Sequence, residues 1–514
     1  MDLKKYLFVL GLMVLFVWVV SANVDQYAIN YYIPGGQIGP NITSWGNSKT
    51  NDNNINININ VGEVIKFNIV ADQSIGTWRW YKDGIIQTNN YNNFTTSWST
   101  TGSKIISVNG TNINGTTNTV IWTITVLNQM TLSSCGNLNK ANYIYVLNSS
   151  VSSNGTCFTI GANNVTLDGK GNNVNYATTA TGYGISDTGG YDNINVRNLA
   201  LNQQNAAVAN AHGMYLRNVI NSRADNINIT TKNNAEGLYL SSSNSNIFSN
   251  LNIQTTNTGA YGIYLTSSNS NSFSGCNIGT AGSNSDGIYI ISSSNSNSFS
   301  GCNITTMGGN GDGIYMTSSN YNSYSGSNIL TSGNGANGIW VNTNANYNNF
   351  SNNNILAGGS GIRLNSASSN IVKGGSIISN LVNDYYLQNS NTNNFINTNF
   401  TTRKIYLNDN SSIFNYANNN IALNTKQIVS PTKVLTITRT LVNWDQANIT
   451  WQEKLSVARM LNYGMGGLLP NSKYSVWNGS ILNYNLTTDS NGNIPNFSIN
   501  LTTLAKSIRV VFNS

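Results

Sequence analysis

A repeat of 23 to 26 residues, running from Gly213 to Ile378, is the feature that most limits how this chain can fold. The three fullest copies each begin with a glycine, alternate apolar and other residues, cross a Ser/Asn-rich segment and end in Asn-Ile; they open at Gly262, Gly287 and Gly313. Weaker copies open at Gly213, Gly237, Gly338 and Gly361. A constant period in this range is typical of a solenoid, in which each repeat is one supersecondary unit.

Each copy carries strand and turn signals but no helix signal. The segment Gly262-Ile-Tyr-Leu alternates apolar residues with a period of two, which indicates a strand with one buried face. Ser-Ser-Asn-Ser-Asn favours a turn, because Asn tolerates left-handed backbone, and Ser-Phe-Ser-Gly and Cys-Asn-Ile supply two more short strands. Such a coil is the unit of a right-handed parallel β-helix, whose strands pair with their copies about 4.8 Å away along the axis.

Stacking these coils aligns equivalent residues in files that only neighbouring coils can bury. Burial of one large apolar side chain contributes roughly 1.5–3 kcal/mol, so we predict that stacking supplies the core. The four predicted apolar files are Leu238, Ile263, Ile288, Ile314, Ile339, Ile362; Leu240, Leu265, Ile290, Met316, Val341, Leu364; Phe248, Phe273, Phe299, Tyr324, Phe350; and Ile253, Ile278, Ile304, Ile329, Ile355, Ile377. A polar file at a turn should form an amide ladder from coil to coil: Asn246, Asn271, Asn297, Asn322, Asn348.

The repeats resemble the parallel β-helix (PbH1) repeats of the pectin-lyase-like superfamily and the surface and periplasmic proteins with NosD-like repeats. The resemblance covers residues 130–428, for which it implies a β-helix of 10–12 coils, and Val165-Thr-Leu-Asp-Gly169 is similar to the first coil of the NosD-like group. The superfamily contains lyases, hydrolases, adhesins and inert structural proteins, so the resemblance is informative about the fold and not about function.

The segments before the repeats predict export and a small β-domain. Residues 1–22 combine Lys4 and Lys5 with a 14-residue apolar run and small residues at Val20-Ser-Ala22, which is typical of a signal peptide; an uncleaved anchor is the alternative and the one expected membrane contact. Residues 23–60 are an Asn-rich leader whose alternating Ile residues suit an edge strand. Residues 61–128 resemble a PKD or immunoglobulin-like β-sandwich with a core Trp in Trp78-Arg-Trp80.

After Pro431 the repeat ends and charged residues return. We assign residues 431–514 to a small, mainly β domain, in which Trp451 to Leu461 is the best candidate for a short helix. The whole chain is thus expected to be all-β, with a right-handed parallel β-helix between two smaller β domains.

Charge argues against a nucleic-acid partner. Only 8% of residues are charged, and the net charge of +7 is spread thinly without a basic run. Nucleic-acid-binding surfaces concentrate Lys and Arg on one face. Asn-Xaa-Ser/Thr sequons such as Asn109-Gly-Thr111 and Asn303-Ile-Thr305 would allow glycosylation of an exported chain.

The residues directly before the repeat glycines form a first candidate site. This pre-glycine column contains His212, Glu236, Tyr261, Asp286, Asp312, Asn337 and Ser360. The resemblance implies that paired carboxylates on a β-helix bind Ca²⁺ or act as acid and base, which would make Asp286 and Asp312, and secondarily His212 and Glu236, catalytic. The alternative is that they are turn residues that cap local backbone. No other cofactor and no metal site are expected, since one histidine is too few for a copper centre.

A second candidate site is a column of aromatic residues that alternate with the inward files and should therefore point outward. Its members are Tyr239, Tyr264, Tyr289, Tyr315 and Trp340. Aromatic rings about 5 Å apart would offer sugar rings a surface for stacking. The alternative is that outward Tyr is simply a favourable strand residue.

The four cysteines are predicted to form two disulfides. Cys276 and Cys302 occupy the same slot in successive coils, at a Cα separation that permits a bond, although a stacked pair of thiols is the alternative. Cys135 and Cys157 remain as the second pair, similar to a pair at the entrance of related surface β-helix proteins.

These features predict a secreted or cell-surface structural or adhesion protein that binds carbohydrate, with a polysaccharide or envelope glycan as partner. The alternative is a polysaccharide lyase or glycoside hydrolase that uses Asp286 and Asp312.

Overall fold

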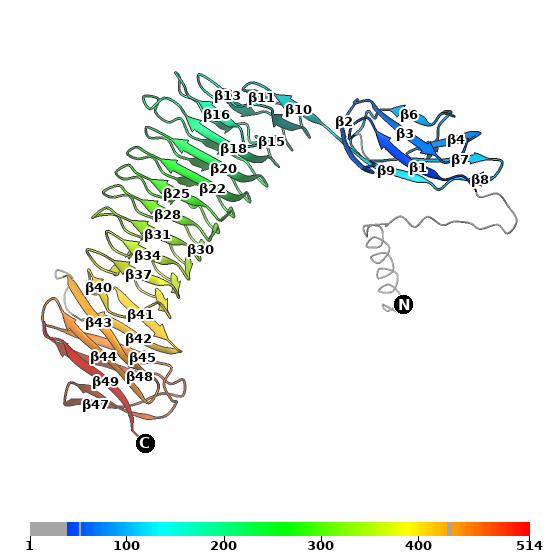
Figure 1. Cartoon of the computed structure of the whole chain (residues 1–514). Helices are drawn as coiled ribbons and strands as arrows, with labels where there is room; N and C mark the ends of the chain where they lie inside the picture. The colour runs from blue at the N-terminus through cyan, green and yellow to red at the C-terminus, as the bar shows by residue number, and fades with distance from the viewer. Residues whose placement is uncertain (1–38, 51–52, 429–433, 514) are drawn as a thin grey trace, which may run out of the picture. The chain divides into compact units, whose positions relative to one another are not determined.

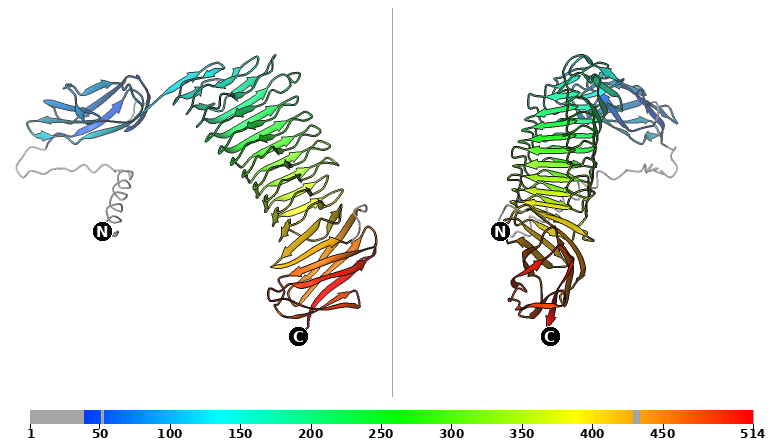
Figure 2. Two further views of the ribbon diagram at one scale, coloured as in Figure 1. Left: turned by 180° about the vertical axis from the view of Figure 1, so that it is seen from behind. Right: turned by 90° about the vertical axis from the view of Figure 1, so that its left-hand side faces the viewer.

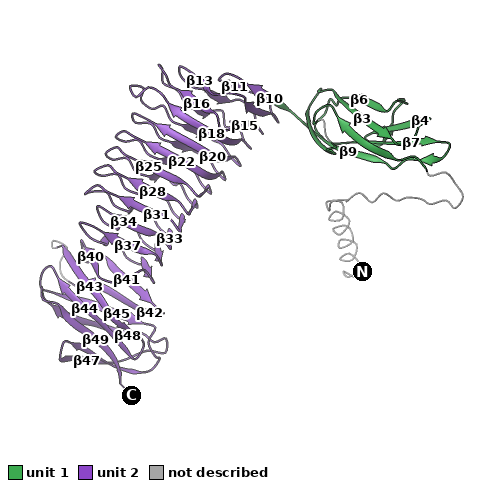
Figure 3. Ribbon diagram, viewed as in Figure 1, with its two compact units in different colours: residues 1–129 green, residues 130–514 purple. Residues whose placement is uncertain are grey.

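The computed structural model describes residues 39–50, 53–428 and 434–513. The predicted signal peptide and much of the leader lie outside the described residues. Within the described part of the chain all regular elements are β-strands, with no helix. No helix that is long and apolar enough to cross a membrane occurs in these ranges. The chain divides into two compact units, Met1–Gln129 and Met130–Ser514, which are treated separately (Figure 3).

Unit 1 is a β-sandwich of two sheets. One sheet is antiparallel and has the order β1-β3-β6, with β1 (Ile42–Asn47), β3 (Ile65–Ala71) and β6 (Asn93–Thr96). The other has the order β2-β9-β7-β4-β5, with β8 (Gly115–Thr116) paired to β7: β2 (Asn56–Asn60), β9 (Val120–Leu127), β7 (Gly102–Asn112), β4 (Thr77–Lys82), β5 (Ile85–Ile86). Strands β1 and β2 come from the expected leader, so the sheets of this unit begin before residue 61, and β2 is an edge strand as its Ile alternation predicted.

The core of unit 1 is aromatic. Trp80 and Trp122 are fully buried and stack with ring centroids 6.0 Å apart, and Phe67 of the facing sheet lies 4.9 Å from Trp122. Their alternation along β3, β4 and β9 sends one side chain in two to the interior, as a half-buried strand requires. Trp78 and Trp80 are therefore core residues and not an exposed platform.

Unit 2 is a parallel β-helix, visible as a stack of coils in Figures 1 and 2. In the described residues, one sheet contains twelve strands that pair in parallel from coil to coil, in agreement with the predicted number of coils: β11 (Gly136–Leu138), β14 (Phe158–Ile160), β17 (Ile185–Asp187), β19 (Met214–Arg217), β21 (Leu238–Ser241), β23 (Ile263–Thr266), β26 (Ile288–Ile291), β29 (Ile314–Thr317), β32 (Ile339–Asn342), β35 (Ile362–Asn365), β38 (Tyr385–Gln388), β40 (Arg403–Leu407). We call it the front sheet.

The other sheet, which we call the back sheet, receives two segments of each coil except the last two, which contribute one each. Its strands up to the end of the repeats are β10 (Gln129–Leu132), β12 (Ile144–Leu147), β13 (Val151–Ser152), β15 (Thr166–Asp168), β16 (Asn173–Tyr176), β18 (Asn195–Gln203), β20 (Arg223–Thr231), β22 (Ile247–Thr255), β24 (Ser272–Ser274), β25 (Asn277–Thr280), β27 (Ser298–Ser300), β28 (Asn303–Thr306), β30 (Ser323–Ser325), β31 (Asn328–Thr331), β33 (Asn349–Ser351), β34 (Asn354–Ala357), β36 (Ile371–Lys373), β37 (Ser376–Ser379), β39 (Asn394–Ile396) and β41 (Ile413–Asn418). In β18, β20 and β22 the two segments are continuous.

The predicted inward files are confirmed. Ile263, Ile288 and Ile314 pair in register along the front sheet and are fully buried. Phe273, Phe299 and their neighbours stack with centroids 4.5 to 5.2 Å apart, which adds aromatic contact to the buried area. The apolar residues of each coil are thus buried by the coils on either side.

The repeat glycines are required by close approach between coils. A Cβ atom on Gly287 would lie 2.3 Å from Cγ2 of Ile304 and 2.7 Å from the carbonyl oxygen of Gly313. The same two kinds of neighbour crowd the equivalent glycines 237, 262 and 313. Any side chain here would force the front sheet away from the file of Ile residues.

The predicted asparagine ladder is present and fully buried. The Asn271 amide donates to Oδ1 of Asn297 at 3.1 Å, and Asn297 donates to Oδ1 of Asn322 at 3.1 Å. Each Oδ1 also accepts the backbone N–H of the preceding coil, as in the 2.9 Å bond from Asn271 N to Asn297. The ladder therefore satisfies backbone donors at a turn that no strand pairing reaches.

Beyond the repeats the two sheets continue with antiparallel strands. In the front sheet β40 pairs with β43 (Leu435–Trp444), followed by β44 (Asn448–Leu455), β46 (Lys473–Asn478), β47 (Ile481–Thr487) and β49 (Lys506–Asn513). In the back sheet β41 pairs with β42 (Ile421–Gln427), followed by β45 (Arg459–Gly466) and β48 (Ile494–Leu501). The residues assigned to a C-terminal domain thus share both sheets with the β-helix.

The helix predicted from Trp451 to Leu461 is wrong. These residues form the end of β44 and the start of β45, and they alternate in burial, with Trp451 and Glu453 inside. Glu453 accepts two bonds from the buried Arg439 guanidinium and one from Trp451 Nε1. Pairing with a buried cation allows a charged residue to face the core, and the tertiary contact outweighs local helix preference.

Candidate functional site

The outward aromatic column runs along the front sheet at the position between its two inward files. The register joins Tyr215 to Tyr239, continues through the predicted residues to Trp340, and extends beyond them. All members are half-buried. The complete column is Tyr215, Tyr239, Tyr264, Tyr289, Tyr315, Trp340, Arg363, Tyr386, Tyr406.

Neighbouring rings in this column are in contact. Centroids of successive rings from Tyr215 to Trp340 lie 4.5 to 5.3 Å apart. The planes vary: Tyr289 and Tyr315 are stacked at 12°, whereas Tyr315 and Trp340 meet edge to face at 87°. Burial raises the pKa of the Tyr239, Tyr264 and Tyr289 hydroxyls, so they stay neutral hydrogen-bond donors. From Tyr215 to Trp340 the rings are thus in continuous contact, but they are tilted against one another and do not form a flat surface.

The pre-glycine column lies against the aromatic column, so the two predicted sites form one surface. Tyr261 stacks on Tyr289 with centroids 4.2 Å apart and planes 1° apart. His212 packs on Tyr183 at 5.6 Å and on Tyr239 at 5.3 Å, and its Nδ1 contacts the carboxylate oxygen Oε2 of Glu236. His212 and Glu236 are therefore neighbours one coil apart, as predicted from their slots.

Asp286 and Asp312 are buried and bond to the backbone of the next coil. Oδ1 of Asp286 accepts the N–H of Asp312 at 2.7 Å, and Oδ1 of Asp312 accepts the N–H and the side-chain amide of Asn337 at 2.7 and 2.9 Å. Ser360 N–H continues the series to Asn337. These bonds run from one coil to the next, between residues 23 to 26 positions apart in the sequence, and so differ from the local backbone caps of the alternative interpretation.

The same burial changes the acidity of both carboxyls. Burial, followed by repulsion from Asp312, raises the pKa of Asp286 well above its usual value. Burial raises the pKa of Asp312 to about 7, against the opposing effect of bonds from Asn337 and the positive charge of Arg363. A protonated carboxyl could donate a proton to a bound molecule, so the shift is compatible with acid–base chemistry as well as with a structural role.

The carboxylates of Asp286 and Asp312 offer few ligands for the Ca²⁺ ion that the resemblance implied. In the described ranges no three His, Cys, Asp or Glu side chains lie close enough to hold a metal ion. Asp286 and Asp312 already use one oxygen each for backbone N–H groups. A Ca²⁺ ion takes six to eight oxygen ligands, so water or ligand hydroxyls would have to supply most of its shell.

Four residues extend the column beyond its predicted members: Tyr215, Arg363, Tyr386 and Tyr406, of which Arg363 alone has no ring. In Gly361-Ile-Arg-Leu364 the arginine occupies the position that Tyr or Trp has in the other copies. The repeat therefore indicates its place in the column, but a column defined by aromatic residues leaves it out. Its guanidinium carbon lies 4.1 Å from the Trp340 ring centroid and 4.7 Å from that of Tyr386. The aromatic column is thus interrupted by one cation that is stacked on both sides.

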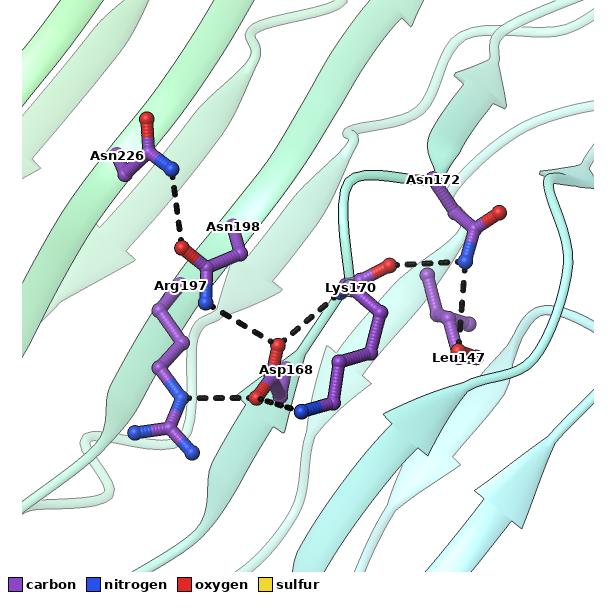
Figure 4. A network of polar contacts seen from close by, with 8 residues as sticks. Leu147, Asp168, Lys170, Asn172, Arg197, Asn198 and Asn226 are labelled. Carbon is purple, nitrogen blue, oxygen red and sulfur yellow. Dashed lines mark hydrogen bonds and ion pairs between the residues drawn. The ribbon is translucent and has the colours of Figure 1, made fainter.

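Asp168 of the Val165-Thr-Leu-Asp-Gly169 segment belongs to a separate polar network (Figure 4). Asp168 pairs with Arg197 at 3.0 Å and Lys170 at 3.4 Å, and it accepts the N–H of Lys170 and the amide of Asn198. Burial opposes ionisation, but these bonds and charges hold the pKa of Asp168 below its usual value. The network joins two coils near the start of the β-helix, which is a structural task and not part of the aromatic surface.

The four cysteines divide into one bridge and two thiols. Cys135 and Cys157 form a disulfide between neighbouring strands at the start of the β-helix, with Cα atoms 4.7 Å apart. The predicted Cys276–Cys302 bridge is wrong: both are free and fully buried, and each thiol faces the carbonyl two residues before it.

Comparison with known proteins gives limited similarity. No protein-family model matches the chain, and no curated protein sequence matches it. Among solved structures, the A-module of the Azotobacter vinelandii mannuronan C-5 epimerase AlgE6 is 12% identical, over 58% of this chain and 81% of that one, with a TM-score of 0.35. Tailspike protein 2 of an Escherichia coli O157:H7 bacteriophage is 11% identical, over 74% and 60%, with a TM-score of 0.31. At these values we draw no functional conclusion from either.

Proposed function

We propose that this chain is an exported surface or secreted protein that binds an extended glycan along the aromatic column of its front sheet. The observation that carries the proposal is the unbroken contact of six outward rings from Tyr215 to Trp340. Half-exposed aromatic side chains combine an apolar face for a sugar ring with a hydroxyl for its polar groups. Repetition of one coil supplies equivalent positions at constant spacing, which suits a repetitive ligand.

Export is supported by the signal-like residues 1–22 and by the Cys135–Cys157 disulfide. Disulfides persist in oxidising compartments outside the cytosol. A glycan of the cell envelope or of a neighbouring cell would then be accessible to the column, and an adhesive or structural role follows from binding without turnover.

The test of this function is a glycan-array screen of the chain beginning at Asn23, with a triple variant as comparison. Tyr264→Ser, Tyr289→Ser and Tyr315→Ser together remove the centre of the column, and we expect at least a tenfold loss of binding with unchanged far-UV circular dichroism. The control is Tyr321→Ser with Tyr347→Ser, a stacked pair on an outer turn that is 62% and 54% exposed. Undiminished binding by the triple variant would exclude the column as the site.

A polysaccharide lyase or glycoside hydrolase remains a second candidate function. The observation in its favour is the raised pKa of Asp286 and Asp312 beside the aromatic column. Release of reducing ends or unsaturated products from the glycans that bind would support it, provided that Asp286→Asn or Asp312→Asn abolishes release. Turnover that persists in both variants would remove these residues from the mechanism, and no turnover on any bound glycan would leave binding alone.

A further inference from the structure

Arg363 occupies a special position in the aromatic column. It lies in β35, in register with Trp340 on β32 and Tyr386 on β38. Both neighbouring rings face the guanidinium, at 4.1 and 4.7 Å. Cation–π contacts are stabilising, and more so when they are shielded from water. Two such contacts hold the guanidinium plane in one orientation before any ligand arrives.

Among the described residues the Arg363 guanidinium has no hydrogen-bond acceptor. Arg363 makes no hydrogen bond or ion pair with any described residue, and its Nε is enclosed without a partner. The neighbouring Nε1 of Trp340 is also enclosed and unpaired. A buried donor without an acceptor is unfavourable for folding, so folding alone does not account for this arrangement.

The carboxyl group of Asp312 lies near Arg363 but does not bond to it. Asp312 is close enough for the guanidinium to lower its pKa, but the bonds of its carboxylate go to Asn337. Beside Arg363 on the same face, Asn365 donates to Asn342 at 3.0 Å, and Asn342 donates to the Tyr315 hydroxyl at 3.0 Å. Neither bond engages the guanidinium, whose terminal N–H groups have no acceptor among the described residues.

We propose that Arg363 makes the column selective for glycans that carry an oxyanion, either the carboxylate of a uronic acid or a sulfate ester. This inference rests on the glycan binding proposed above. The planar guanidinium presents parallel N–H groups that match two oxygens of one anion, and such charge-assisted pairs are stronger than neutral ones. Tyr289 and Tyr315 would hold the sugar rings, while Arg363 holds the anionic substituent two coils beyond Tyr315.

The test measures binding of three probes to the full chain by isothermal titration calorimetry. The probes are an oligogalacturonate, its carboxyl-reduced neutral counterpart, and a sulfated form of that neutral oligosaccharide. We expect the anionic probes to bind at least tenfold more tightly than the neutral one. Arg363→Gln should bring the affinities for anionic and neutral probes close to each other, and Arg363→Lys should lose most of the preference because an ammonium lacks the planar fork. The control Lys373→Gln removes an equal charge from the same coil on the back sheet and should change nothing.

The outcomes separate the two proposals. A preference for the carboxylate over the sulfate would identify a uronic acid, and equal preference would identify the negative charge itself as the recognised feature. Neutral binding that depends on Tyr264, Tyr289 and Tyr315, without any anionic preference, would overturn the inference and leave the proposed function intact. An anionic preference that survives Arg363→Gln would overturn it as well. Binding of no glycan at all would overturn both.

Discussion

At the scale of single residues, Asp286 and Asp312 show how one slot serves structure and chemistry together. Both accept backbone N–H groups of the next coil, and both are almost fully buried. The next residue in the column is Asn337, which makes the equivalent bond to Ser360 N–H without a charge. An amide is therefore sufficient for the turn, and the two carboxyls add an acidity that the fold itself does not need.

We predict that these two carboxyls make the chain less stable as pH rises from 4 to 7. Their pKa values in the folded chain are raised, to about 7 for Asp312, and return to about 3.9 on unfolding. In this window the folded chain binds more protons than the unfolded one, so the free energy of unfolding falls with increasing pH. For Asp312 alone, the raised pKa corresponds to a loss of at most about 4 kcal/mol in the free energy of unfolding as pH increases.

Urea unfolding at pH 5 and pH 8 measures this effect, with an Asp286→Asn, Asp312→Asn variant for comparison. The variant should lose most of the pH dependence, and Asp187, whose pKa burial raises to about 6, should account for a residual slope. Carboxylates with a lowered pKa, such as Asp168 and Asp409, change the stability only below about pH 5, outside the measured range of pH 5 to pH 8. Equal slopes in the two proteins would contradict the prediction.

At the scale of the structural element, one coil is stable only through its neighbours. Its apolar files, its aromatic rings and its turn amides all find partners one coil away. Parallel register makes this pairing of like with like unavoidable, and it favours residues that pair with themselves, such as Asn, Phe and Ile. The same geometry places Cys276 beside Cys302 of the next coil.

The buried amide ladder should contribute more to stability than an exposed one. Asn297→Ala removes bonds to Asn271, Asn322 and Ser268 and leaves the N–H of Asn271 without an acceptor. We expect a loss of roughly 2–4 kcal/mol, since each unpaired buried group costs about 1–3 kcal/mol. The matched control is Asn303→Ala in the exposed ladder, where Asn328 donates to Asn303 Oδ1, and water can replace that bond.

The midpoint of urea unfolding, followed by tryptophan fluorescence and by circular dichroism, checks both substitutions. A solenoid can unfold in segments, so hydrogen exchange of the coils on either side of Asn297 should be measured as well. Equal effects of the two substitutions would show that burial of the ladder adds nothing.

At the scale of the whole molecule, the described strands of unit 1 form sheets separate from those of unit 2, whereas the last coil of the β-helix is joined to antiparallel strands. β43 covers the edge of β40, and β45 covers the edge of β42. An uncovered strand edge offers unpaired N–H and C=O groups to another chain, so the end of a solenoid needs such a cover.

We therefore predict that removal of residues 434–514 causes self-association. The truncated chain exposes two long edges, in β40 and β42, and should elute as oligomers or aggregates in size-exclusion chromatography with light scattering. The control removes residues 23–128, which contribute β1 to β9 and no pairing to the β-helix, and should leave the mass that of a monomer. A monomeric 434–514 deletion would contradict the capping role.

Much of the fold and part of the site could be predicted because the period of a repeat determines which residues of neighbouring coils are in contact. Once the period places Tyr264 beside Tyr289, the inward files, the asparagine ladder and the aromatic column follow from the alternation of a strand. The position of Arg363 was available in the same way, but its role was not, because its importance comes from the two rings that enclose it and the absence of an acceptor.

The sequence by itself determined the coil, its register and the outward position of the tyrosines, since equivalent residues of identical coils must meet. Only the tertiary structure decided three matters. It turned Trp451 to Leu461 into strands, because the buried pair of Arg439 with Glu453 and the open edge of the β-helix outweigh local helix preference. It left Cys276 and Cys302 as buried thiols, each of which faces the carbonyl two residues before it. It tilted the tyrosine rings, because half-buried side chains pack against neighbours that the period does not specify.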